Sequence, residues 1–203
     1  MILNISRKIF FISLYLCISV AHGNDNNSNR IEILVNEKVI TKYDITQRMK
    51  INSIIQRVEI GENNYDQLLN AVIDDLIVEK LKNDKIHEFN INVNREELKK
   101  HETRFYSNIN YEKEELKKLF SINNINFNQL LEFIETEVKW QKLIYGLYMR
   151  VTTATQQEIN ELMSNNPEMS EKIASDIILQ KQIEIKSTKL IKDLRDEATI
   201  EYK

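Results

Sequence analysis

The sequence predicts a mostly α-helical protein: a multi-helix core with a small two-stranded sheet formed by its N- and C-terminal strands. Its 203 residues include only three glycines and one proline, too few for the many tight turns of an all-β fold. Apolar residues recur at three- and four-residue steps along most of the chain, which is the period of an amphipathic helix. Short β-branched runs stand near both ends. Since a lone strand leaves its backbone groups unpaired, we expect the two runs to pair with each other.

The N-terminal strand is predicted at residues 31–35, which read Ile-Glu-Ile-Leu-Val and show partial alternation of apolar and polar residues. Asn36 and Glu37 mark a turn after this strand. Thr41 is then a candidate N-cap, because Asp44 stands three residues later and can reach back to it as in a capping box. A first helix is therefore expected after Thr41.

The second helix has the clearest periodicity of the chain. Asp74, Asp75 and Glu79 fall on the side opposite its apolar stripe. An acidic pair can serve acid–base chemistry, but charges on the polar face of an amphipathic helix are usually solvated. We therefore assign Asp74 and Asp75 no catalytic role. The stripe consists of Leu68, Leu69, Val72, Ile73, Leu76, Ile77 and Leu81.

Three further helices follow, each introduced by a capping residue or a polar turn. Asn94 and Glu97 form a possible capping box before the first of them. A shorter helix begins near Tyr111 and stops around Asn123, and the longest one opens after Asn126. Their apolar residues are Leu98, Phe105, Tyr106, Leu116, Leu119, Phe120, Phe127, Leu130, Leu131, Ile134, Val138, Trp140, Leu143, Ile144, Leu147 and Tyr148.

The C-terminal part of the chain predicts two more helices and a strand. The run Thr155-Gln156-Gln157-Glu158 is a full capping-box pattern and predicts a helix start. A long amphipathic helix is expected from about Ile173 to Leu194, with apolar residues again at helical spacing. Residues 198–202, which read Ala-Thr-Ile-Glu-Tyr, are the predicted closing strand.

Residues 1–23 have the pattern of a secretory signal peptide. Arg7 and Lys8 precede an apolar stretch at residues 9–20, and Ala21-His22-Gly23 places small residues at the expected cleavage site. The apolar stretch is short for a membrane span, although an uncleaved anchor remains the alternative. Residues 24–29 are expected to form a disordered polar linker. The single cysteine, Cys17, lies in the segment expected to be removed, so the mature protein would carry no thiol.

The mature sequence offers little catalytic or cofactor chemistry. Only His87 and His101 remain after cleavage, and without cysteine neither a Cys-His site nor a zinc site of familiar spacing can be built. No G-x-x-x-x-G-K-[ST] loop is present, which argues against a nucleotide bound by a P-loop. The mildly acidic net charge of −3 argues against nucleic acid as the main partner. We therefore predict no catalytic residue, no metal site, no cofactor and no enzymatic activity.

Several of these segments together resemble the SurA family of periplasmic chaperones. The run Ile73-Asp74-Asp75-Leu76-Ile77, the helix entry from Thr155 to Ile159 and the closing segment from Leu194 to Ile200 match patterns of that family in the same order. One or two parvulin-type prolyl isomerase domains sit before the closing segment in SurA proteins. Here only a short linker at residues 164–170 stands in that place, too short for a domain of about 100 residues. The resemblance implies one SurA-like helical core over residues 30–203.

The same resemblance implies an ATP-independent periplasmic chaperone that holds unfolded outer-membrane proteins, or other extended polypeptides, during transit. Two alternatives stay open: a periplasmic adaptor that binds one folded partner, and a divergent peptidyl-prolyl isomerase, for which no catalytic centre can be placed. A client groove between helices would be lined by adaptable apolar side chains. Candidate groove residues are Met49, Phe105, Tyr106, Phe120 and Tyr148.

Overall fold

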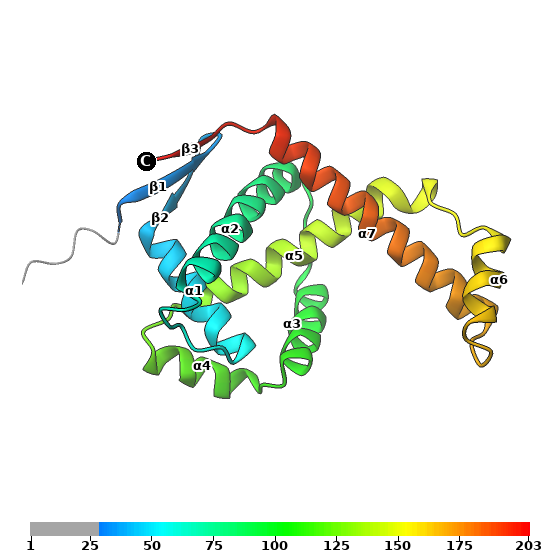
Figure 1. The fold of residues 1–203 in the computed structure, drawn as a ribbon, viewed down its shortest axis with the longest axis horizontal. Coiled ribbons are helices and arrows are strands. Elements are labelled where there is room, and N and C mark those ends of the chain that lie inside the picture. Colours follow the sequence, from blue (N-terminus) through cyan, green and yellow to red (C-terminus); the bar gives the residue numbers. More distant parts are fainter. Residues whose placement is uncertain (1–28) are drawn as a thin grey trace, which may run out of the picture.

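The computed structural model describes residues 29–203. The predicted signal peptide, residues 1–23, lies outside the described residues, as does the predicted linker except for Asn29. Helices dominate the described chain, so the predicted mostly α-helical class is confirmed (Figure 1). In chain order the elements are β1 (Ile31–Val35), β2 (Lys38–Thr41), α1 (Lys42–Gln56), α2 (Tyr65–Glu88), α3 (Arg95–Ile109), α4 (Lys113–Ile122), α5 (Phe127–Tyr148), the 3-10 helix η1 (Met149–Val151), α6 (Gln156–Ser164), α7 (Glu171–Glu197) and β3 (Ile200–Tyr202).

The two ends of the described chain meet in one antiparallel sheet of order β2-β1-β3. Ile33 lies opposite Tyr202 and Val35 lies opposite Ile200, which confirms the predicted pairing of the first and last strands (Figure 1). The sheet has one strand more than predicted, because the chain continues as β2 after the turn at Asn36. That residue adopts the left-handed conformation, with φ 52°, which asparagine tolerates better than most residues.

Asn36 also joins the start of the chain to its end. Its backbone N–H donates to the carbonyl oxygen of Thr199 at 2.7 Å. Its side-chain Oδ1 accepts a hydrogen bond from the backbone N–H of Thr199 at 3.0 Å. One residue therefore shapes the β1–β2 turn and anchors the segment that leads into β3.

The sheet, α1 and α2 share the first apolar core. Strand β1 alternates across the sheet, so Ile33 and Val35 are both buried. Leu194, Ala198 and Ile200 from the C-terminal segment pack against the same core, which makes the last helix and strand part of the N-terminal module. The buried members are Ile33, Val35, Ile40, Ile45, Met49, Val72, Leu76, Ile77 and Leu81.

A second core lies between α1, α3, α4 and α5, around the fully buried side chains of Leu116, Phe120 and Leu130. The buried amide of Gln47 links α1 to the segment before α5. Its Nε2 donates to the carbonyl of Asn124 at 3.1 Å, and its Oε1 accepts from the N–H of Asn126 at 2.8 Å. A buried polar group with both hydrogen bonds made fixes this junction at no desolvation penalty.

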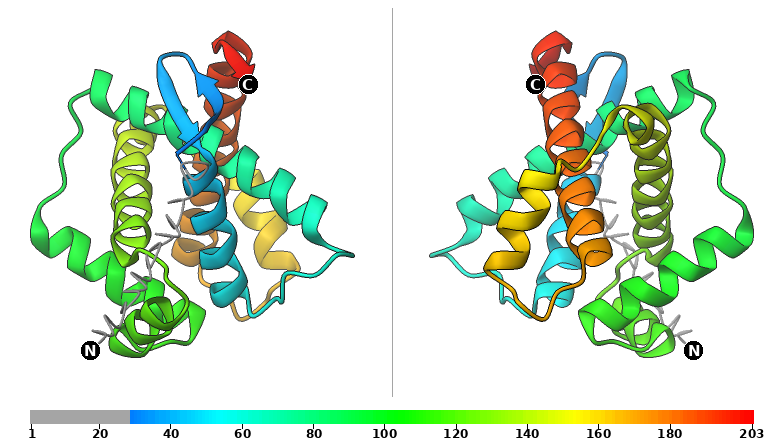
Figure 2. Two further views of the ribbon diagram at one scale, coloured as in Figure 1. Left: turned by 90° about the vertical axis from the view of Figure 1, so that its left-hand side faces the viewer. Right: turned by 90° about the vertical axis from the view of Figure 1, so that its right-hand side faces the viewer.

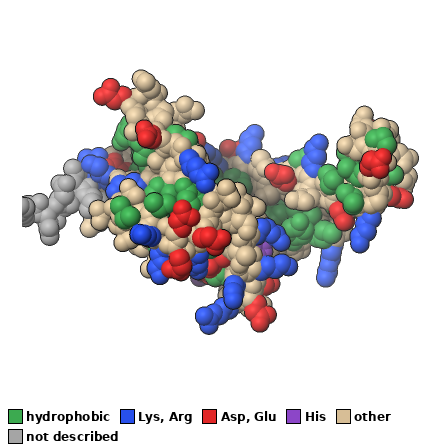
Figure 3. All heavy atoms as spheres, turned by 90° about the horizontal axis from the view of Figure 1, so that it is seen from below, with side chains coloured by type: hydrophobic (Ala, Val, Ile, Leu, Met, Phe, Trp, Pro, Cys, Tyr) green, Lys and Arg blue, Asp and Glu red, His purple; other side chains and the backbone are tan. Residues whose placement is uncertain are grey.

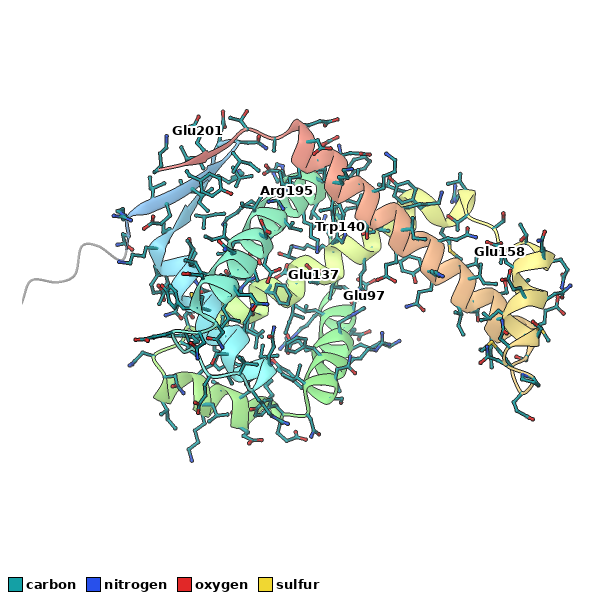
Figure 4. The ribbon with its side chains drawn as sticks, in the orientation of Figure 1. Glu97, Glu137, Trp140, Glu158, Arg195 and Glu201 are labelled. Carbon is teal, nitrogen blue, oxygen red and sulfur yellow. The ribbon has the colours of Figure 1, made fainter. Side chains whose placement is uncertain are left out.

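A third core forms where α5 passes beneath the C-terminal half of α7. Trp140 packs there with Leu143 and Ile183, and its indole Nε1–H donates to the hydroxyl of Ser187 at 3.0 Å. Figure 4 shows Trp140 below α7 and Arg195 further along the same helix. Arg195 is paired with Asp74 of α2 at 2.6 Å, so α7 is fastened to both α5 and α2.

Helix α7 is longer than the surface it covers. Its 27 residues span about 40 Å, and only the C-terminal half packs on α2 and α5. The N-terminal half extends away and packs against α6 (Figures 1 and 2). We call residues 149–182, which comprise η1, α6 and this half of α7, the arm, and the rest of the described chain the body. No helix within residues 29–203 is long and apolar enough to cross a membrane.

Candidate functional site

The arm concentrates the exposed apolar surface of the described chain. Of the fifteen large apolar side chains that stay exposed there, six lie on the arm or within four residues of its ends. Val151 is 68% exposed and Ile173 is 52% exposed, although such side chains are normally buried. Clustered exposure of this kind marks interaction surfaces more often than scattered exposure does. The six are Tyr145, Met149, Val151, Ile173, Ile177 and Ile185.

Seen from below, apolar side chains gather where the arm leaves the body, with Lys and Arg side chains around them (Figure 3). An apolar surface with charged edges can bind apolar side chains of a partner while the cations keep it soluble.

Methionine is also concentrated on the arm. Met149, Met163 and Met169 all belong to it, and the only other methionine among residues 29–203 is Met49 in the body. An unbranched thioether side chain can adopt many shapes at little cost, so methionine is common on surfaces that bind varied partners. Met163 and Met169 are half-buried against the arm's own core, where they can repack.

The arm's own core is thin, consisting of Ile159, Ala174 and Ile178. Hydrogen bonds supply much of the rest. The predicted capping box is present, with the Glu158 N–H donating to the Thr155 hydroxyl and the Thr155 N–H donating to the Glu158 carboxylate at 2.9 Å. Gln182 of α7 donates to the other Glu158 oxygen at 3.0 Å. Few buried contacts hold α6, so its position can change at low cost.

The electrostatics of Glu158 follow from this network, and Figure 4 shows the residue on α6 facing α7. The backbone N–H of Thr155 is the main cause that holds the pKa of Glu158 below its ordinary value, followed by the Thr155 hydroxyl and then by Gln182. The charged carboxylate is therefore the form that ties α6 to α7.

The predicted groove residues do not form one surface. Met49, Tyr106 and Phe120 are buried in the body, Met49 in the first core and the other two in the second. Phe105 is half-buried beside Tyr106, and Tyr148 is half-buried under α7 in the third core. Met49 and Phe120 are buried in these cores, so their side chains cannot contact a client in this structure.

Two features of these residues bear on function. Lys186 lies over the Tyr148 ring, 5.8 Å from its centre, so Tyr148 contacts α7 in the body, directly before the arm begins. Tyr106 carries the only buried side-chain polar atom among residues 29–203 that has no hydrogen-bond partner, its hydroxyl oxygen. Burial first, and the nearby carboxylates of Glu102 and Glu114 next, raise the pKa of Tyr106 to about 12.

Within the part of the chain that the structure describes, no three His, Cys, Asp or Glu side chains lie close enough to hold a metal ion.

The sequence prediction did not identify the arm as a site. Its signals were the clustering of methionines at positions 149, 163 and 169 and the apolar positions of α7 that exceed what one packing face needs.

Comparison with solved structures shows which known fold this architecture resembles. One similar structure comes from a study that describes the virulence factor PEB4 and the periplasmic protein Cj1289 of the human pathogen Campylobacter jejuni as two structurally related SurA-like chaperones. The match covers 86% of this chain and 99% of that chain, with a TM-score of 0.53 and 13% sequence identity. This chain has the fold of a SurA-like chaperone. The sequence matches no known family profile and no curated protein.

The SurA-like fold confirms the resemblance on which the sequence prediction depended. The segments that carried the resemblance lie at these places in the fold: residues 73–77 lie in α2, residues 155–159 open α6, and residues 194–200 lead from α7 into β3. In this SurA-like fold the linker that was predicted at residues 164–170 is the short connection between α6 and α7. The connection joins two helices that pack directly on each other.

Proposed function

We propose that this protein is an ATP-independent chaperone that binds unfolded polypeptides on the arm. The observation that carries the proposal is the exposed apolar surface of the arm in a SurA-like fold, with Met149 exposed and Met163 and Met169 half-buried against the arm's own core. The surface is apolar enough to hold the side chains of an unfolded chain, and its methionines can repack around clients of different sequence.

The same surface accounts for release without a nucleotide. Each exposed side chain, such as Val151, Ile173 or Ile177, contributes a small apolar contact, so binding is the sum of several weak contacts. A client segment that folds buries its own apolar residues and thereby withdraws them from the arm. The client's folding then provides the favourable free energy for dissociation.

The proposal extends to the compartment and the client class. Residues 1–23 have the pattern of a signal peptide, and one of the two proteins named with the similar structure is described as periplasmic. We therefore propose export to the periplasm and unfolded outer-membrane proteins as clients. Such clients suit a surface of separate apolar contacts, because their strands alternate apolar and polar residues.

We also propose that the protein acts without prolyl isomerase activity. The connection between α6 and α7, residues 165–170, contains no secondary structure and is far too short for a catalytic domain of ordinary size.

Aggregation of unfolded clients tests the chaperone proposal. An unfolded outer-membrane β-barrel protein is diluted from urea with the purified protein at increasing molar ratio, without ATP, and light scattering is recorded. We expect delayed aggregation near equimolar ratio for this client and for at least one unrelated unfolded protein. Protection of no unfolded protein, together with stable binding to one folded periplasmic protein, would establish the adaptor instead.

A proline-limited refolding assay tests the absence of isomerase activity. The uncatalysed step takes about tens to hundreds of seconds at 25 °C. We expect this rate to stay unchanged as the protein concentration rises, with a commercial prolyl isomerase as the positive control. Acceleration in proportion to the protein concentration would show that the protein is an enzyme.

A further inference from the structure

Helices α3 and α4 line a groove of about 610 Å³ in the body. Lys99, Glu102, Thr103 and Ser107 of α3 line one wall. The other wall is the start of α4, with Glu112, Lys113 and Glu115. We call it the α3–α4 groove. Its lining is polar, unlike the surface of the arm.

Tyr106 lines the same groove and brings an unpaired hydrogen-bonding group to it. The residue is 7% exposed, and no described group lies within hydrogen-bond distance of its hydroxyl oxygen. A buried polar group without a partner is costly, so proteins rarely keep one without a reason. Phenylalanine would fill the same space in the second core without this penalty.

The first turn of α4 adds further free donors. Glu112 occupies the N-cap position but makes no side-chain hydrogen bond to the helix, so the amide groups of the first turn lack the cap that α1, α3 and α6 have. Helix amides without a cap accept a partner from outside the helix. The hydroxyl of Tyr106 and these amides therefore offer donors toward one groove.

The charges of the groove decide which acceptor fits. Lys99 and Lys113 are outnumbered by Glu102, Glu112 and Glu115, and Glu114 is near enough to Tyr106 to disfavour a negative charge there. A carboxylate or phosphate would meet this negative potential and lose binding energy. A neutral acceptor meets no such repulsion, and the amide carbonyl of a polypeptide is the common neutral acceptor.

We propose that the α3–α4 groove binds an extended segment of the unfolded client through its backbone, with the hydroxyl of Tyr106 donating to a client carbonyl oxygen. This inference rests on the proposed chaperone function and adds a second, polar contact region to the apolar arm. Backbone recognition is independent of client sequence, which suits a protein with many clients. In this proposal the arm binds apolar side chains of the client, and the groove binds the client's backbone.

Lys113 lies over Tyr106 at the wall of the groove. Lys113 is paired with Glu102 across the groove at 2.7 Å and lies over the Tyr106 ring, 5.8 Å from its centre. The side chain of Lys113 is 42% exposed and that of Glu102 is 17% exposed, so the lysine end of this partly buried pair reaches solvent. Lys113 can therefore swing away when a client segment enters.

The variant Tyr106→Phe tests the proposal, because it removes only the hydroxyl. Binding is measured by fluorescence anisotropy with labelled, reduced and carbamidomethylated lactalbumin, a permanently unfolded chain, and stability is measured by thermal unfolding. We expect Tyr106→Phe to raise the Kd by about 3- to 10-fold, the equivalent of one net hydrogen bond, while the melting temperature stays equal or rises. Tyr65→Phe, at an exposed residue of α2, is the matched control and should change neither quantity.

Three results would overturn the proposal. If the Kd of Tyr106→Phe is unchanged while substitutions on the arm still weaken binding, the groove does not bind clients. The proposed chaperone function would then still stand. A fall in the melting temperature would mean that the hydroxyl is already satisfied by internal water, so that it is not free for a client. If the unsubstituted protein fails to bind the unfolded chain at all, the chaperone function and the groove fail together.

A crosslinking experiment locates the contact independently. Thr103→Cys places a thiol on the exposed wall of the groove, where a benzophenone maleimide can be attached. We expect light-dependent crosslinks to the unfolded lactalbumin that an excess of unlabelled client suppresses. Lack of crosslinks, with efficient crosslinking from the same probe at Ile173→Cys on the arm, would contradict the proposal.

Discussion

Arg48 and Glu79 form the most deeply buried ion pair among residues 29–203, with side chains 8% and 15% exposed. The guanidinium also lies over the ring of Phe133, 4.9 Å from its centre. The pair joins α1 to α2 and contacts α5 at the same time. Removing one member of such a pair leaves the other charge buried without its partner, whereas removing both does not.

We therefore expect Arg48→Met to lower the free energy of unfolding by about 3–5 kcal/mol, and the double variant Arg48→Met/Glu79→Leu to be close to neutral or stabilising. Urea unfolding followed by circular dichroism measures both. Lys189→Met, which breaks an exposed pair with Asp193, is the control and should leave the transition unchanged. Equal loss in the single and double variants would contradict the argument from a stranded charge.

Glu158 gives the arm a dependence on pH. Its pKa is lowered in the folded protein, mainly by the N–H of Thr155, so the carboxylate contributes stability above the unfolded-state pKa. That contribution is lost as the pH falls through the lowered pKa. We expect α6 and the first half of α7 to lose hydrogen-exchange protection in acid before the body does.

The variant Glu158→Gln should remove this difference between the arm and the body and reduce protection of residues 156–182 at neutral pH. Glu161→Gln, on the same helix and exposed, is the matched control. If the arm of Glu158→Gln still loses hydrogen-exchange protection in acid before the body does, carboxylates other than Glu158 cause the effect.

At the level of elements, the arm is the part that should bind clients. Ile173 and Ile177 are 52% and 42% exposed on one side of α7, so replacing them costs little stability. We expect Ile173→Asp/Ile177→Asp to weaken binding of an unfolded polypeptide at least 10-fold and to shift the melting temperature only slightly. The change inserts two charges where apolar side chains of the client lie.

Ile122→Asp is the control for the arm variant, because Ile122 is just as exposed but lies at the end of α4 in the body. It should bind clients as the unsubstituted protein does. Equal weakening by both substitutions would mean that general surface charge, and not the arm, governs binding.

Local sequence signals predicted the helices because their causes are local. The capping boxes Thr41–Asp44, Asn94–Glu97 and Thr155–Glu158 are all present, since a cap depends on residues three positions apart. Strand β2 was missed because its four residues gain stability only from pairing with β1. The candidate site was missed for a similar reason. Met49 and the exposed arm residues look alike in sequence, and only tertiary packing decides which are covered.

At the scale of the whole molecule, β3 closes the body. Ile200 packs against the first core, as do Ala198 and Leu194. Deleting residues 198–203 removes the contacts of Ala198 and Ile200, leaves β1 without one partner, and releases Asn36 from Thr199. We expect the truncated protein to lose about 1.5–3 kcal/mol of its free energy of unfolding, the value for burying one large aliphatic side chain such as Ile200.

Thermal unfolding of the truncated and complete proteins measures this loss. Asn36→Gly in the complete protein is a milder companion, because it keeps β3, tolerates the positive φ of the turn and removes the clamp made by the side-chain oxygen. Identical melting temperatures for the truncated and complete chains would show that β3 contributes nothing to the stability of the body.

The β1–β3 pairing also sets the order in which the chain can fold. Strand β1 emerges early from a ribosome or an export channel, whereas its partner at residues 200–202 emerges after every helix. A hairpin of β1 and β2 is marginal alone, and the first core lacks Leu194 and Ile200 until that moment. The body therefore cannot finish folding while the chain is still being delivered.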